Sequence, residues 1–174
     1  MARRGITLLR EGGTDPVIVV TGATGPDTDV SGPEPGVINV HNPDWPTGMG
    51  SSLAVGLGAV PDECTAAVLA LADQPLVGPE AVRRLLAAHA AGASVAVACY
   101  GGQRRNPVLI SREHWPEVIA LASGDVGARP FIRAHSDLVT EVECVDTGRP
   151  DDVDSPEDLA RIEALLARIA PFPS

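Results

Sequence analysis

Residues 66–75 read AAVLALADQP, an apolar run that ends on a carboxylate, an amide and a proline. A run without polar alternation is typical of a strand that is buried on both faces of its sheet. Helical patterns separate this run from several others. The sequence therefore predicts a three-layer α/β domain, in which helices cover both faces of a mostly parallel, Rossmann-like sheet. The expected strands occupy residues 16–22, 36–42, 65–72, 93–100, 107–111 and 138–146.

Helices are expected where apolar residues recur at helical spacing between a start signal and a stop signal. Residues 78–92 are an example, since Pro79 lies near the first turn and Gly92 lies just beyond the end. The 174 residues suit one domain, 1–174, with room for a proper core. Further helices are expected at residues 2–12, 51–60, 112–124 and 155–170, with a short helix or turn pair at 125–135.

The composition restricts the class of partner. The formal net charge is −10, and all 13 basic residues are arginine, which argues against nucleic acid because nucleic-acid binding requires a basic face. No apolar stretch approaches the length of a membrane span, and the N-terminus does not resemble a signal peptide, so a cytoplasmic location is expected. Cys64, Cys99 and Cys144 are widely spaced, which favours buried thiols over a zinc site.

Two carboxylates are candidates for a metal site. In open α/β sheets ligands bind at the carboxyl ends of strands, where Asp73 follows the most apolar run, and a carboxylate suits Mg²⁺. Alternatively, Asp73 begins a turn, since Asp-x-Pro is good turn chemistry. Asp154 lies in DDVDSPED (151–158) just before an expected helix. It either points into the same site or, like its neighbours, stabilises the helix start.

The stretch NPDWPTGMGSS (42–52) suits an anion site. Its glycines permit close approach of a ligand, and Ser51 and Ser52 stand where a helix N-terminus offers free N–H groups. Alternatively, it is a capped loop that packs a tryptophan on the core. Asn106 in RRNPV and Gly127 in GDVGAR are further candidates, either as ligand-binding residues or as turn residues.

Taken in order, these segments resemble the MocA/MobA-like nucleotidyltransferases, which include the molybdenum cofactor cytidylyltransferases. The resemblance is carried by NPDWPTGMGSSLAVGL, LALADQPLV, NPVLI, SGDVGAR and DVDSPEDL, and it runs from about residue 2 to residue 165. It implies transfer of CMP from CTP to a molybdopterin-type acceptor with release of pyrophosphate. It also implies Mg²⁺ as cofactor and a molybdoenzyme as a further partner.

The resemblance assigns roles to individual residues. Asp73 holds the Mg²⁺, and Asp154 is the second carboxylate near it. Asn106 stands where the family usually has histidine, and it retains hydrogen bonding but cannot carry a proton. The residues implied to line the nucleotide and acceptor pockets are Asn42, Gly48, Met49, Ser51, Ser52, Gln74, Asn106 and Gly127.

The front of the chain departs from the family pattern. Family members open with a strand and a glycine-rich loop of the form LAAGxSxRMGxxK, whereas residues 2–22 match the helix and the second strand that follow. We therefore expect an N-terminally truncated domain that lacks its first strand, with open sheet edges and weak or no CTP turnover. The alternatives are a non-catalytic molybdenum-cofactor-binding partner or chaperone, and a nucleotidyltransferase for another cofactor or a sugar phosphate.

Overall fold

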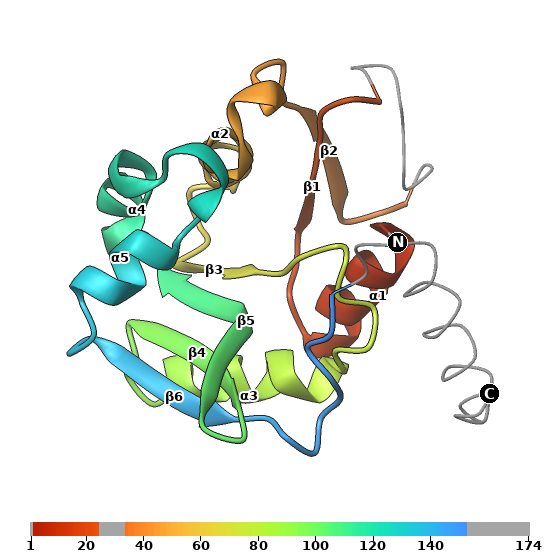
Figure 1. Ribbon diagram of the computed structural model, residues 1–174. Helices are drawn as coiled ribbons and strands as arrows, with labels where there is room; N and C mark the ends of the chain where they lie inside the picture. Colours follow the sequence, from red (N-terminus) through yellow and green to blue (C-terminus); the bar gives the residue numbers. More distant parts are fainter. Residues whose placement is uncertain (1, 25–33, 153–174) are drawn as a thin grey trace.

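The computed structural model describes residues 2–24 and 34–152 (Figure 1). The strands are β1 (Val17–Thr21), β2 (Val37–His41), β3 (Ala66–Leu69), β4 (Val95–Tyr100), β5 (Gln103–Ser111) and β6 (Val139–Glu143). The helices are α1 (Ala2–Gly12), α2 (Met49–Gly58), α3 (Pro79–Ala90), α4 (Trp115–Leu121) and α5 (Arg129–Ala134). Short 3-10 turns lie at η1 (Trp45–Thr47), η2 (Arg112–His114) and η3 (Gly124–Val126). None of these helices is long and apolar enough to cross a membrane.

The described strands form two sheets. β1 pairs with β2 in parallel, and the second sheet has the order β3-β5-β4-β6. β4 and β6 are parallel, whereas β5 is antiparallel to both of its neighbours. The antiparallel pairing arises because Gly101 and Gly102, at φ 59° and 79°, return the chain in a tight turn. The domain is therefore an α/β domain, as expected, with mixed strand directions.

The larger sheet is covered by helices on both faces, which gives the expected three layers. Successive residues of β5 point to opposite faces, so Val108 and Ile110 join one apolar cluster and Leu109 joins another. The first cluster lies under α2, α4 and α5 and includes Phe131, which is fully buried. The second face packs against α3 through Leu85. This double coverage explains why the end of β5 is apolar without alternation.

One edge of β1 and one edge of β3 lack a strand neighbour within residues 2–24 and 34–152. β1 pairs with β2 alone, and β3 pairs with β5 alone. Figure 1 shows β1 and β3 as members of separate sheets, with α1 and α2 near them. The open sheet edges expected from the sequence are therefore present in the described part of the chain.

Several element boundaries differ from the sequence-based expectation. Helix α2 begins at Met49 rather than Ser51, because Gly48, at φ 114°, turns the chain into the helix earlier. Strand β5 begins at Gln103, so the hairpin turn is confined to the two glycines before it. Strand β3 ends at Leu69, short of the expected residue 72. The helix expected at residues 155–170 lies outside the described residues.

The cysteines are free thiols, as expected. Cys99 and Cys144 are buried, and Cys64 is half-buried. Burial raises the pKa of the Cys144 thiol above its ordinary value, so this thiol stays neutral at physiological pH. A neutral, enclosed thiol such as that of Cys144 is a poor nucleophile and a poor metal ligand.

Candidate functional site

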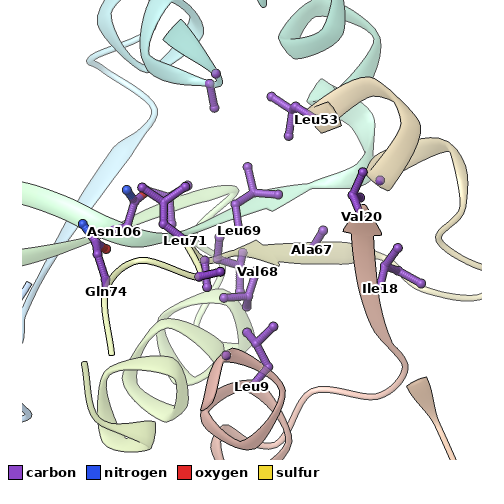
Figure 2. Close-up of a pocket in the computed structure, with 18 of the residues that line it drawn as sticks. Leu9, Ile18, Val20, Leu53, Ala67, Val68, Leu69, Leu71, Gln74 and Asn106 are labelled. Carbon is purple, nitrogen blue, oxygen red and sulfur yellow. The ribbon is translucent and has the colours of Figure 1, made fainter. Parts of the chain in front are cut away.

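A cleft of about 1630 Å³ lies between the two sheets. Its walls come from β1, β3, α1 and α2, and its polar residues include Gln74 and Asn106. Figure 2 shows these two side chains on the opposite side of the view from Ile18 and Val20 of β1. Within the cleft, an apolar part can therefore be distinguished from a polar part.

The loop of residues 42–52 is organised around one buried amide. Asn42 is 0% exposed, and its Nδ2 donates hydrogen bonds to Ser51 Oγ (2.8 Å) and Ser52 Oγ (3.0 Å). Its Oδ1 accepts a hydrogen bond from the backbone N–H of Asp44 (3.0 Å). Neither Asn42 nor Ser51 lines the cleft, whereas Ser52 does. Asn42 therefore shapes the loop, and of these three predicted residues Ser52 is the one exposed to a ligand in the cleft.

The same loop contacts a segment far away in the sequence. The backbone N–H of Met49 donates to Asp125 Oδ1 (3.2 Å). A β-carbon at Gly48 would collide with the backbone of Gly124, and one at Gly127, at φ 54°, would lie 3.1 Å from Met49 Sδ. The small size of Gly48 and Gly127 permits this contact between the two loops, and their place in a nucleotide or acceptor pocket stays a prediction. Met49 and Gly127 line the cleft, and Gly48 does not.

The loop after β3 meets the far end of the described chain. Gln74 is 5% exposed, and its Nε2 donates to Asp152 Oδ1 at 2.7 Å. Its Oε1 is buried and has no hydrogen-bond partner among the described residues. Asp73 is half-buried, and it is not among the cleft-lining residues although its neighbours Ala72 and Gln74 are. Asp154 lies outside the described residues, so the convergence of Asp73 and Asp154 stays a prediction.

The groups at this loop are of the kind that a hard divalent cation prefers. Asp73 offers a carboxylate, and Gln74 offers an amide oxygen that lacks a described donor. Oxygen ligands of this type suit Mg²⁺, which is usually bound through one or two carboxylates and substrate phosphates. Within residues 2–24 and 34–152, no three His, Cys, Asp or Glu side chains gather in a cluster that could hold a metal ion. These described residues therefore suit a site in which the metal ion is bound partly by the protein and partly by the phosphates of a ligand, rather than by protein side chains alone.

Three arginines in the cleft were not singled out from the sequence. Arg105, Arg129 and Arg133 line the cleft, and none of them forms an ion pair with a described residue. Arg104, by contrast, is paired with Glu141 at 2.8 Å. Arg105 lies in RRNPV and Arg129 in GDVGAR, where the sequence-based prediction named Asn106 and Gly127 instead, and Arg133 follows Arg129 by four residues. In a chain without lysine, these guanidinium groups are cations that the described part of the cleft offers to a bound phosphate.

Tyr100 also lines the cleft, but as a neutral group. Burial raises the pKa of its phenol above the ordinary value, so the phenol stays protonated at physiological pH. The cleft therefore offers oxygen acceptors around Gln74 and cations on β5 and α5. This combination suits the binding and positioning of a phosphorylated ligand with a divalent metal ion.

Comparison with known proteins places this chain in a family. The family model described as "MobA-like NTP transferase domain" matches residues 1–139. The nicotine blue oxidoreductase of Paenarthrobacter nicotinovorans is 34% identical, and the alignment covers 91% of this chain and 84% of that protein. Its name describes a redox activity, whereas the family description names a transferase.

Solved structures agree with the fold. Rv0371c from Mycobacterium tuberculosis H37Rv superposes with a TM-score of 0.75 at 27% identity, over 91% of this chain and 80% of that chain. A nucleotidyl transferase from Methanothermobacter thermautotroptrophicus gives a TM-score of 0.78 at 21% identity, over 97% of this chain and 81% of that chain, and supports the fold alone. Because the family model spans most of the chain, this protein belongs to the family of MobA-like NTP transferase domains.

Proposed function

We propose that the polar part of the cleft transfers a nucleotidyl group, with CTP as donor and a molybdopterin-type molecule as acceptor. The observation that carries this proposal is the 2.7 Å hydrogen bond between Gln74 and Asp152. It joins the loop that bears Asp73 to Asp152, which precedes Asp154 by two residues in the sequence. The family assignment supports a nucleoside triphosphate as the substrate.

The proposed reaction is an in-line displacement. A phosphate oxygen of the acceptor attacks the α-phosphorus of the triphosphate, the bond to the β-phosphate breaks, and pyrophosphate leaves. No covalent intermediate with the protein is required, so the protein acts by positioning the reactants and stabilising charge. Arg105, Arg129 and Arg133 line the cleft and would offset the charge of the triphosphate and of the leaving pyrophosphate.

Asp73 and Asp154 are the residues that would hold Mg²⁺. When bound, the ion supplies Lewis-acid stabilisation of the phosphate oxygens. The manganese complex of Rv0371C, at 27% identity and a TM-score of 0.68, supports a divalent metal in this family without specifying magnesium. Gln74 would orient the site, because its amide holds Asp152 on one side and leaves an oxygen free on the other.

The remaining binding residues form the wall opposite the phosphates. Ser52, Met49 and Gly127 line the cleft there, held by the Asn42 hydrogen bonds and by the contact with residues 124–127. We assign the base and the acceptor to this side, whereas Asn106 lies near Gln74 in the polar part of the cleft, where it would donate a hydrogen bond to the ligand. Product transfer to a molybdoenzyme would follow, and this role suits a single-domain protein of the cytoplasm.

The test is metal-dependent nucleotide binding, followed by turnover. Residues 1–174 contain no segment of the form LAAGxSxRMGxxK, so we expect weak pyrophosphate release, and binding is the safer readout. Calorimetry with CTP, GTP and ATP in the presence of Mg²⁺ should favour CTP. Asp73→Asn should weaken Mg–CTP binding at least tenfold, whereas Asp137→Asn, at an exposed residue outside the cleft, should not. Equal binding by both variants would reject the metal assignment.

A second candidate is an oxidoreductase, favoured by the name of the 34% identical relative. It predicts a redox reaction of nicotine blue, followed by the change in the dye's absorbance, without pyrophosphate release. A third candidate is a non-catalytic molybdenum-cofactor-binding partner, which predicts molybdopterin binding that does not depend on CTP. A nucleotidyltransferase for another cofactor or a sugar phosphate would show pyrophosphate release only with that acceptor. The four outcomes are distinguishable in one panel of assays.

A further inference from the structure

A carboxylate from a distant segment lies at the start of helix α2. The chain between α4 and α5, which contains η3, passes beside α2 (Figure 1), and the backbone N–H of Met49 donates to Asp125 Oδ1 at 3.2 Å. Met49 is the first residue of α2, so this N–H has no acceptor within the helix. The N-terminus of α2, a favourable position for an anion, is therefore occupied by the protein's own Asp125.

Asp125 retains most of its capacity to accept hydrogen bonds. It is exposed, it lines the cleft, and it forms no ion pair with a described residue. The N–H of Met49 uses one lone pair of Oδ1, and Oδ2 has no hydrogen bond to any residue within 2–24 and 34–152. An ionised carboxylate can accept about four hydrogen bonds. Asp125 therefore places two adjacent acceptor oxygens at the wall of the cleft, in a position fixed by α2.

Ser52 offers a hydrogen-bond donor one helical turn further along α2. Its Oγ accepts from Asn42 Nδ2 at 3.0 Å, and its own hydroxyl proton has no acceptor among the described residues. Ser52 lines the cleft and follows Met49 by three positions, so the two residues share a face of the helix, with their β-carbons about 5–6 Å apart. The wall therefore carries two acceptors and one donor at a spacing that the edge of a heterocyclic ring can bridge.

Two apolar side chains border these polar groups. Met49 is 42% exposed and Val126 is 40% exposed, and both line the cleft. One belongs to each of the two segments that the Met49–Asp125 hydrogen bond joins, so their apolar surfaces lie close to the carboxylate. A planar ring buries its faces against such side chains while its edge reaches the polar groups. An ammonium ion would leave the apolar surface and the Ser52 hydroxyl unused, so the combination favours a flat heterocycle.

The order of donors and acceptors decides which heterocycle fits. A 2-amino-4-oxopyrimidine edge, found in pterins and in guanine, carries an amino group, then a ring N–H, then a carbonyl oxygen. The two donors would bond to the two oxygens of Asp125 as a charge-assisted bidentate pair, and the carbonyl would accept from Ser52. Cytosine and adenine have an unprotonated ring nitrogen beside the amino group, and uracil has no amino group. Each of these bases would therefore turn an acceptor toward the carboxylate.

We propose that Asp125 and Ser52 bind the 2-amino-4-oxopyrimidine edge of a ligand ring, with Met49 and Val126 against the faces of the ring. This inference rests on the proposed function, in which the ring is the pterin of the acceptor and the cytosine of CTP lies elsewhere in the cleft. Asp125 then determines which acceptor binds, and it takes no part in the displacement at phosphorus.

The test compares two pairs of ligands that differ at this edge, by calorimetry with the 174-residue chain. Pterin is paired with lumazine, which has an oxo group in place of the 2-amino group, and GTP is paired with ITP, which lacks the amino group. Without metal or CTP, pterin should bind at least about tenfold more tightly than lumazine, and GTP should bind no more tightly than ITP.

Each other result has a definite meaning. A preference for GTP over ITP, without one for pterin, would support recognition of the edge but overturn its assignment to the acceptor. Equal affinities within both pairs, or no binding of any of the four, would overturn the proposal. If Asp73→Asn still weakens Mg–CTP binding in that case, the proposed function stands and this inference alone fails.

Matched variants separate recognition of the edge from support of the loop. Asp125→Asn replaces one acceptor oxygen with an amino group and should remove the preference for pterin over lumazine, whereas Asp137→Asn, at an exposed residue outside the cleft, should keep it. If Asp125 only holds the loop, both affinities would fall together and the preference would persist, which would overturn the proposal. The ligand pairs on the unmodified chain decide the proposal even if Asp125→Asn does not fold.

Discussion

Replacing Asn42 with alanine should be among the most disruptive single changes outside the apolar core. The side chain is fully buried and makes three hydrogen bonds, with Ser51 Oγ, Ser52 Oγ and the backbone N–H of Asp44. A hydrogen bond contributes about 1 kcal/mol net, and a buried group left without a partner costs about 1–3 kcal/mol. Asn42→Ala should therefore lower the free energy of unfolding by about 3 kcal/mol.

The assay is urea denaturation followed by circular dichroism, with two matched variants. Ser52→Ala removes one of these hydrogen bonds and should lower the free energy of unfolding by about 1 kcal/mol. Thr47→Ala removes a hydrogen bond from an exposed hydroxyl to Asp44 O and should change it by less than about 1 kcal/mol. If Asn42→Ala is no more destabilising than Thr47→Ala, the amide does not organise the loop and the reasoning is refuted.

Three further predictions concern a cationic side chain of the cleft, the unfolding of the protein by acid and the packing of its core. Arg105→Gln should weaken Mg–CTP binding measured by calorimetry, whereas Arg83→Gln, which removes an exposed ion pair with Glu80 outside the cleft, should not; equal affinities would remove Arg105 from the site. The hydrogen bond from Arg84 lowers the pKa of Asp146 below its ordinary value, so the stabilising effect of the ionised carboxylate is present at neutral pH and is lost as the pH falls through the lowered pKa of the folded state. Acid unfolding of Asp146→Asn should lack this contribution, and an unchanged acid transition would contradict it. Phe131→Ala should lower the free energy of unfolding by about 3–5 kcal/mol, because the ring is fully buried; a loss below 1 kcal/mol would show that the core is loosely packed there.

The sequence predicted the layers of the fold well because periodicity reports burial directly. The unbroken apolar run of β3 and the alternating faces of β5 both follow from helices on two sides of the sheet. The boundaries of helices and strands were less predictable where a glycine with a positive φ precedes the element. Gly48 starts α2 two residues early, and Gly101 with Gly102 confines the hairpin to two residues. A positive φ is compatible with glycine but not dictated by it, so the sequence does not specify where it occurs.

The site was predicted in part. Of the predicted loop residues, Met49 and Ser52 line the cleft, and the sequence did not indicate that Asn42 and Ser51 would bond to each other. Pairings between side chains depend on tertiary contacts, and so does the meeting of Gln74 with Asp152, 78 residues apart. The arginines were missed for the same reason, since unpaired guanidinium groups are recognised only when the positions of the acidic residues are known.

The central claim is that Asp73 and Asp154 share one metal ion with the triphosphate. The most direct measurement is anomalous diffraction from crystals grown with Mn²⁺ and a non-hydrolysable CTP analogue. The claim predicts one metal peak about 2.1 Å from an oxygen of each carboxylate, in contact with the analogue's phosphates and beside the Gln74–Asp152 hydrogen bond. A nucleotide bound elsewhere, or a metal that contacts neither carboxylate, would contradict the proposed function.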